Sequence, residues 1–301
     1  MRGGRRDDSL SRSAFPSHAQ PAPLDVRWLL RKYGLRPDKA LAQNFLIDPA
    51  SLRRVVEAAD LIGDEVVLEI GAGLGSLTRF LAPVSRRVVA VEFDRRLIPP
   101  LEEAVASLTN VSIVNDDVLS LDLGDLMGGE TYRVVANIPY NITSILIRHL
   151  MEAPHPSRLI VLTLQREVAE RIMAGPGEMS LLALSVGVYG RPSLCGRIAA
   201  GAFYPRPSVD SAVLRIDVDD RPRIAPSMID PVFALARAGF GQKRKKLVNA
   251  LASGLDESRS AVAGWLEEAG IPATTRAQEL TVQDWERLTS ARQGADEGRS
   301  S

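Results

Sequence analysis

The chain has 301 residues, 45% of them hydrophobic and 25% charged, and its acidic and basic side chains balance to a formal net charge of zero. A chain of this length and composition supports a globular protein with a large core and a second, smaller unit. Because the net charge is zero, any affinity for nucleic acid has to come from a local basic patch and not from the field of the whole molecule.

Residue types that would indicate metal, disulfides or membranes are scarce. The single cysteine, Cys195, permits no intrachain disulfide and predicts a reducing compartment. The three histidines, His18, His149 and His155, lack the spacing of metal ligands. No apolar run approaches the ~18 residues of a membrane span, and no apolar core follows the basic start of the chain as a secretion signal requires. We therefore expect a cytoplasmic protein without a metal or a membrane partner.

The first 24 residues are rich in Arg, Ser and Pro and show no hydrophobic period. We therefore expect residues 1–24 to be a disordered tail, with contact to RNA phosphates as the less favoured alternative. Order is expected to begin near Asp25, because Val26, Leu29 and Leu30 share one face of a short helix.

A second helix is expected to begin at Pro49, with Asp48 as its N-cap. The residues shortly before it, 43–46, are Gln-Asn-Phe-Leu. Two amides beside an aromatic ring are unusual packing material before a helix. The pattern leaves open whether this segment is a loop with a hydrophobic staple or part of a functional site.

The segment 66–78 changes its hydrophobic period at a cluster of glycines. Residues 66–70 are mainly apolar, as in a strand buried on both faces of a parallel sheet, and from Leu74 the apolar residues recur at helical spacing. The turn between them contains Gly71, Gly73 and Gly75. Such a turn predicts that a ligand approaches the backbone and the first amides of the following helix.

The glycine pattern narrows the class of ligand. Dinucleotide-binding turns have the form G-x-G-x-x-G, and here Ser76 occupies the place of the third glycine. Glu92 ends the next apolar segment, about the ~20 residues onward at which an acid binds ribose hydroxyls. We therefore expect a nucleoside-containing cofactor. The combination resembles the cofactor site of S-adenosylmethionine-dependent methyltransferases, and a purely structural turn is the alternative.

From residue 65 onward, short apolar segments alternate with helical ones, which predicts an α/β fold with a doubly wound parallel sheet. Two further strand-like runs, 181–189 and 211–216, predict an antiparallel pair at the sheet edge and bring the count to seven. The other strands are expected near 65–70, 87–92, 111–115, 132–136 and 159–164, and the helices near 75–83, 95–107, 142–151 and 165–173.

A change of composition at residues 217–222 indicates a domain boundary. We expect a Rossmann-like methyltransferase domain at residues 25–219 and a small all-α domain of four short helices at 220–292. The polar residues 293–301 are expected to be frayed.

Asn137-Ile138-Pro139-Tyr140 follows a predicted strand, at the same sheet edge as the glycine turn, where open α/β sheets bind ligands. Pro139 restricts Ile138 to an extended backbone. The Asn137 side-chain oxygen and the Ile138 carbonyl can then accept both hydrogens of an exocyclic amine on a planar base, while the Tyr140 ring stacks on the base. Accepting these hydrogens makes the nitrogen more nucleophilic. A structural Asx-Pro turn is the alternative.

A target base has to leave its stack to reach such a pocket, and a second ring should cover its other face. Phe203, in a loop that also contains Pro205 and Pro207, is the candidate, with a role in filling the core as the alternative.

The strongest local basic patch is predicted at the start of a helix in the small domain. Some of its cations are expected to be only solvated, because four in succession point around a helix. Binding to RNA phosphates is the favoured role. The candidate RNA contacts are Lys243, Arg244, Lys245 and Lys246, together with Arg206 beside the pocket.

Together these motifs resemble the ribosomal-RNA adenine N6-dimethyltransferases, and within that family the bacterial small-subunit branch. The resemblance runs from about Lys39 to Leu288. The matching segments are 43–46, 69–75, Glu92, 115–119, 137–142, 203–213 and 242–246.

The resemblance implies that S-adenosylmethionine is the cofactor, and it implies contacts to particular residues. Asp116 is an alternative to Asp117 as the residue that recognises the adenine amine, because the two acids adjoin. The implied contacts are Asn44 and Leu46 at the methionine end, Gly71 beside the cofactor, Glu92 at the ribose, Asp117 at the adenine, and Asn137 between cofactor and substrate.

The resemblance also implies the reaction, which is the transfer of two methyl groups to N6 of each of two adjacent adenines in a hairpin loop near the 3′ end of 16S rRNA. The partner would be this rRNA or the assembling small subunit, and we expect a monomer. A 23S rRNA dimethyltransferase of the macrolide-resistance type is a rival, although that branch tends to carry Asn in place of Asp210. A non-catalytic assembly or transcription factor is disfavoured by the intact Gly71 and Asn137, and a nicotinamide dehydrogenase by Ser76.

Overall fold

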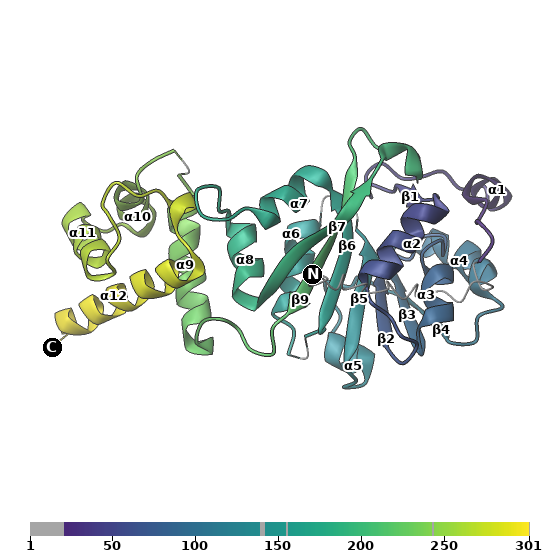
Figure 1. The fold of residues 1–301 in the computed structure, drawn as a ribbon, viewed down its shortest axis with the longest axis horizontal. Coiled ribbons are helices and arrows are strands. Elements are labelled where there is room, and N and C mark those ends of the chain that lie inside the picture. The colour runs from purple at the N-terminus through teal and green to yellow at the C-terminus, as the bar shows by residue number, and fades with distance from the viewer. Residues whose placement is uncertain (1–20, 139–141, 155, 243, 301) are drawn as a thin grey trace, which may run out of the picture.

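The computed structural model describes residues 21–138, 142–154, 156–242 and 244–300. It shows a layered α/β unit with a group of helices at one end (Figure 1). The predictions for residues 1–20, Tyr140 and Lys243 lie outside the described residues.

The α/β unit is built on a seven-stranded sheet with the order β4-β3-β2-β5-β6-β9-β7. Strands β2 to β6 are parallel, β9 runs antiparallel to β6, and β7 runs antiparallel to β9. A separate antiparallel pair joins β1 (Phe45–Leu46) to β8 (Phe203–Tyr204). The sheet strands are β2 (Val66–Ile70), β3 (Arg87–Glu92), β4 (Val111–Asn115), β5 (Tyr132–Asn137), β6 (Leu159–Gln165), β7 (Gly190–Ile198) and β9 (Ser211–Val218).

Helices cover both faces of this sheet, because alternate residues of its central strands are apolar on each side. Val67 and Val135 belong to a core with α2 (Pro49–Ala58) and α3 (Thr78–Leu81). Their neighbours Leu68 and Val134 belong to the core on the other face. That second core is completed by α5 (Leu123–Met127), α6 (Thr143–Met151), α7 (Arg166–Met173) and α8 (Leu181–Tyr189), while α4 (Ile98–Val105) packs beside β3.

The first two helices begin where the sequence predicts. Helix α1 (Val26–Lys32) has Asp25 as its N-cap, and the Asp25 side chain accepts a hydrogen bond from the Trp28 amide. Asp48 accepts in the same way from Ser51 at the start of α2. Both predictions are therefore confirmed.

One predicted strand is wrong. Residues 181–189 form the buried helix α8, and the edge strand is β7, at residues 190–198. Residues 181–189 are apolar on every side, and such a run has no period that separates a buried helix from a buried strand. Strand β7 was missed because it contains Pro192 and Gly196, with a bulge between Leu194 and Gly196, features that depress strand propensity but are accepted at a sheet edge.

Four helices follow the sheet, as predicted. Their apolar residues join the core on one face of the sheet without a break, so the two regions share a hydrophobic cluster. Gly187 allows α8 and the start of α12 to approach closely, because a Cβ at Gly187 would lie 3.2 Å from Cγ2 of Val282. The helices are α9 (Ile229–Phe240), α10 (Leu247–Leu255), α11 (Arg259–Glu268) and α12 (Val282–Ser300), so α12 continues past residue 292, where we expected the chain to fray.

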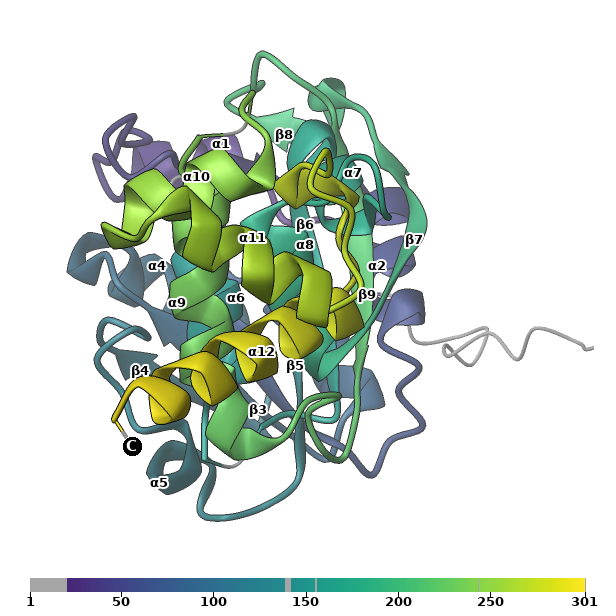
Figure 2. The same ribbon diagram turned by 90° about the vertical axis from the view of Figure 1, so that its left-hand side faces the viewer.

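The strand order reverses between β2 and β5, since the chain runs outward from β2 through β3 to β4 and then returns to β5 on the other side. The carboxyl ends of β2 and β5 therefore border a switch point, the place where α/β sheets bind ligands. Helices α1 and α10 both lie on the upper side of the molecule in the two views (Figures 1 and 2).

Candidate functional site

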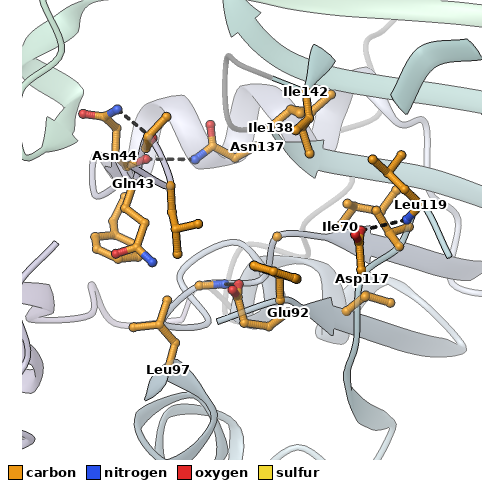
Figure 3. Close-up of a pocket in the computed structure, with 18 of the residues that line it drawn as sticks. Gln43, Asn44, Ile70, Glu92, Leu97, Asp117, Leu119, Asn137, Ile138 and Ile142 are labelled. Atoms are coloured by element: carbon orange, nitrogen blue, oxygen red, sulfur yellow. Dashed lines mark hydrogen bonds between the residues drawn. The ribbon is translucent and has the colours of Figure 1, made fainter. Parts of the chain in front are cut away.

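A cavity of about 300 Å³ lies at this switch point (Figure 3). Four segments form its wall: the residues before α2, the turn after β2, the ends of β3 and β4, and the end of β5. The lining residues are Leu41 to Phe45, Ile70, Gly71, Gly73, Val91, Glu92, Phe93, Leu97, Asp116 to Leu119, Asn137, Ile138 and Ile142.

The glycine turn has the conformation that its composition requires. Gly71, Gly73 and Gly75 have φ angles of 73°, 60° and 83°, a region that other residues rarely adopt. A Cβ on Gly73 would lie 3.1 Å from two atoms of the Phe45 ring, and one on Gly75 would lie 3.0 Å from Leu101 Cδ1. The turn is therefore packed between Phe45 on one side and Leu101 of α4 on the other. The helix after it is shorter than predicted, since α3 begins only at Thr78.

Glu92 holds this turn from the neighbouring strand. Its Oε2 accepts a hydrogen bond from the Gly73 amide at 2.7 Å, and its Oε1 accepts one from the Asp94 amide at 2.8 Å. The side chain is buried, and burial raises the pKa of its carboxyl above the ordinary value. The two amides fix the carboxyl group at the pocket wall, where each oxygen has a second lone pair for a ligand hydroxyl.

Phe93 is a pocket residue that sequence reasoning missed. Its side chain is 60% exposed although it is aromatic and lines the cavity. The available signal was its place directly after the acid at the end of a strand. Asp116 and Asp117 also both line the cavity, and Asp117 is the more buried of the two. Asp117 as the adenine-recognising acid stays a prediction.

Asn137 connects the end of β5 to the segment before α2. Its Nδ2 donates to the Asn44 carbonyl at 3.1 Å (Figure 3). Because its nitrogen is engaged there, the group that Asn137 can offer a ligand is its Oδ1 acceptor. Ile138 also lines the cavity. The structure therefore brings Asn44, Gly71, Glu92, Asp117 and Asn137, which the resemblance implies as cofactor contacts, to one pocket. The contacts themselves stay predictions.

Two predicted site residues lie in the core. Leu46 and Phe203 pair across β1 and β8 with 2% and 3% of their surface exposed, and neither lines the cavity. Both pack in the cluster that contains α2. In this structure the Phe203 ring has the core-filling role that the sequence left open as the alternative. Its stacking role stays a prediction.

The segment before α2 that lines the cavity, residues 41–45, is called the roof here. It is held by a group of polar and charged side chains, the clasp, which consists of Asp38, Gln43, Asp94 and Arg96. Gln43 Nε2 donates to Asp94 Oδ2 at 2.8 Å, and Gln43 Oε1 accepts from the Asp38 amide at 2.8 Å. Arg96 donates to Asp94 at 2.7 and 2.8 Å and to Asp38 at 3.0 Å. Its guanidinium holds the pKa of the Asp94 carboxyl below its ordinary value. The clasp ties the roof to the loop that follows Glu92.

Glu69 is a buried acid under the glycine turn. It is 1% exposed, and no hydrogen bond reaches its Oε2. Burial is the main cause that raises its pKa to about 8, and the nearby Glu92 adds to the effect. At neutral pH its carboxyl group therefore carries a proton.

Within the described ranges, no three His, Cys, Asp or Glu side chains come together as a metal-binding group. Every helix in the described part of the chain is too short or too polar to cross a bilayer.

The fold and the pocket define a class. The seven strands, with their antiparallel β7–β9 edge, combine with a glycine turn after β2 and an acid at the end of β3. These features define a class I S-adenosylmethionine-dependent methyltransferase.

Comparisons with known proteins give the family. The family model for ribosomal RNA adenine dimethylase matches residues 35–292. The "Ribosomal RNA small subunit methyltransferase A" of Alkaliphilus metalliredigens is 39% identical over 275 residues, which cover 89% of this chain and 96% of that protein. The protein of the same name from Dehalococcoides mccartyi is 39% identical over 94% of this chain and 96% of its own length.

Solved structures agree with this result. The 23S rRNA methyltransferase ErmE has a TM-score of 0.64 and 27% identity, over 83% of this chain and 99% of that one. A dimethyladenosine transferase from Plasmodium falciparum has a TM-score of 0.68 and 24% identity, over 81% and 95%, and supports the fold. The chain belongs to the ribosomal RNA adenine dimethylase family, and it is an S-adenosylmethionine-dependent rRNA adenine dimethyltransferase.

The clasp predicts an effect of Arg96 on the cofactor although Arg96 does not line the cavity. Arg96→Ala should loosen the roof and weaken S-adenosylmethionine binding by about threefold to tenfold, the range expected for lost hydrogen bonds to a charged group at a partly exposed site. Calorimetric titration measures this change. Arg95→Ala is the matched control, because Arg95 is exposed and has no side-chain contact in the described structure. Equal effects of the two substitutions would contradict a role of the clasp.

Glu69 predicts a pH-dependent stability. Its folded pKa of about 8 lies above the ordinary 4.5, so its favourable contribution is complete below pH 4.5 and is lost as the pH rises to about 8. Glu69→Gln mimics the protonated side chain. The free energy of unfolding of this variant, minus that of the wild type, should therefore increase from pH 5 to pH 8, by up to a few kcal/mol, and then level off. Denaturant unfolding at several pH values measures it, and a pH-independent difference would refute the burial argument.

Proposed function

We propose that this chain transfers methyl groups from S-adenosylmethionine to N6 of two adjacent adenines in 16S rRNA, forming N6,N6-dimethyladenosine, and that it acts during small-subunit biogenesis. The curated relatives with 39% identity carry the small-subunit name, which favours this substrate over the 23S rRNA of the ErmE structure. The observation that carries the proposal is that Glu92 and Asn137, on different strands, border one cavity.

The pocket fits the cofactor on three counts. A Cβ on Gly73 would crowd the Phe45 ring at 3.1 Å, and with Gly71 and Gly73 at this place the turn presents only backbone to the cavity. The carboxyl group of Glu92, fixed by two amides, suits the ribose hydroxyls. The exposed ring of Phe93 beside it suits the flat face of the adenine, and we add Phe93 to the proposed cofactor residues. A bound S-adenosylmethionine supplies an electrophilic methyl group on its sulfonium.

The remaining proposed cofactor contacts follow the sequence assignments. Asp117 would accept from the adenine amine. Gly71 lines the cavity, and the Asn44 carbonyl accepts a hydrogen bond from Asn137. Leu46 would act through the position of the segment before α2, since its side chain is buried under that segment.

The target amine is activated by hydrogen-bond acceptors. Asn137 Oδ1 and the Ile138 carbonyl would accept the two N6 hydrogens, which moves the nitrogen lone pair out of conjugation with the ring. No strong base is needed, because the proton leaves during or after methyl transfer. Holding the two reactants in line can contribute roughly 7–11 kcal/mol. The ring of Tyr140 would stack on the target base and complete the proposed site. This role is assigned from the sequence alone.

The RNA contacts remain proposals at defined positions. Arg244, Lys245 and Lys246 are exposed in the loop that precedes α10, and not along a helix as expected. Arg206 is exposed in the segment after β8. With Lys243 they form the proposed phosphate-binding set, which would make RNA binding salt-sensitive. We further propose that the protein acts as a monomer in the cytoplasm.

Asn137→Ala tests the activation of the amine. We expect a loss of about 100-fold in kcat, as for other sites that lose one transition-state hydrogen bond, with a much smaller change in S-adenosylmethionine affinity. Asn137→Asp is the comparison variant, because it keeps an acceptor oxygen while it replaces the donor to Asn44 with a carboxylate oxygen and adds a negative charge, so it should retain more activity than Asn137→Ala. Rapid-quench methyl transfer gives kcat, and nearly full activity of Asn137→Ala would remove the proposed role.

The substrate is tested by transfer of labelled methyl groups to unmodified small and large ribosomal subunits, with mass-spectrometric mapping of the labelled nucleotides. We expect label on two adjacent adenines of the small-subunit RNA. Label on an adenine of the large-subunit RNA would instead establish the macrolide-resistance alternative, and absence of label on both would refute the proposed function.

A further inference from the structure

Helix α1 presents a surface of cations and one tryptophan that the proposed function has not used. Residues 26–37 contain four basic side chains and no acidic one. Arg27, Trp28, Arg31 and Arg36 are all exposed. We define these four side chains, three on α1 and Arg36 in the segment that follows it, as the α1 surface.

Trp28 is the exposed tryptophan of the chain. Its side chain is 47% exposed, whereas Trp265 and Trp285, the only other tryptophans, are 2% and 0% exposed. Helix α1 packs against the rest of the protein through its opposite side, where Leu29 and Leu30 are buried in a small cluster with Phe45. Trp28 can therefore offer much of its ring surface to a partner.

The charge of the α1 surface is largely uncompensated. Lys32 is neutralised by Glu103, and its ammonium also lies 5.0 Å from the centre of the Trp28 ring. No ion pair joins Arg27, Arg31 or Arg36 to the rest of the described residues. Flat aromatic surface beside free cations is the combination that binds single-stranded nucleic acid.

The α1 surface is continuous with the pocket region. The Arg27 guanidinium lies 4.8 Å from the centre of the Tyr204 ring. Tyr204 pairs across the β1–β8 ladder with Phe45, which lines the cavity. Helix α10, after the basic loop, lies on the same upper side of the molecule, toward the opposite end (Figure 1).

We propose that the α1 surface binds the single-stranded rRNA that flanks the target adenines, with a base stacked on Trp28 and phosphates beside Arg31 and Arg36. This inference rests on the proposed RNA substrate. An RNA strand is favoured over a protein partner because the surface combines one exposed ring with three cations that form no ion pair among the residues the structure describes. Together with the loop before α10, it would hold the RNA on both sides of the everted base.

The first experiment uses the tryptophan fluorescence of the full chain. Since Trp28 alone is exposed, stacking of a base should quench its emission and protect it from acrylamide, while Trp265 and Trp285 give a constant background. The probe is an unmodified RNA hairpin with two adjacent adenines in its loop and a single-stranded extension. Unchanged emission and unchanged acrylamide access at saturating RNA would overturn the proposal.

The second experiment compares Trp28→Ala with Trp28→Phe in methyl transfer to unmodified small subunits. Loss of the ring should raise KM by about fivefold or more, the low end of the effect of losing one base–aromatic stack. Phe should largely restore it, and S-adenosylmethionine affinity should be unchanged in both. Equal KM values for the three proteins would overturn the role of Trp28, whereas a wild type that labels no subunit would refute the proposed function itself.

The cations are tested by salt dependence. Arg31→Ala should reduce the slope of log affinity against log salt by about 0.7, as for one single-strand phosphate contact. Arg158→Ala is the matched control. Arg158 is exposed and directly precedes β6, so it lies at the amino ends of the parallel strands, whereas the pocket lies at their carboxyl ends. The same slope for both variants would overturn phosphate binding by α1.

Discussion

The pocket depends on hydrogen bonds that hold the roof, the segment before α2, over the switch point of the sheet. Asn137 holds it from β5 through the Asn44 carbonyl, and Asp94 and Arg96 hold it from the loop after β3 through Gln43. Without these contacts the ends of β2, β3 and β5 would form an open sheet edge. With them, these strand ends border a pocket of about 300 Å³ that stays open to solvent on one side.

Related contacts connect the proposed binding of the cofactor with the proposed activation of the target amine. Glu92 fixes the glycine turn and stands at one side of the cavity, and Asn137 fixes the roof and stands at the other. Each residue therefore positions backbone and also offers an acceptor to a ligand. In the proposed mechanism catalysis therefore rests on position and on hydrogen-bond acceptors, without a strong base.

Much of this arrangement could be predicted from the sequence because it depends on local patterns. Five parallel strands, the glycine turn and the N-cap at Asp48 are set by residues next to one another in the chain. Helix α8 was misread because a uniformly apolar run has no period. Phe203 shows the other limit, since an aromatic residue in a loop gives no sign of whether its ring faces a ligand or the core. The clasp was unpredictable because Gln43 and Asp94 are 51 residues apart.

The central claim is that one cavity binds the methyl donor with its reactive end toward Asn137. A crystal structure of the full chain with S-adenosylhomocysteine tests it directly. The account predicts the ribose hydroxyls within hydrogen-bond distance of Glu92 and the sulfur on the side of the cavity nearest Asn137. A ligand bound elsewhere, or in this cavity with its sulfur directed away from Asn137, would contradict it.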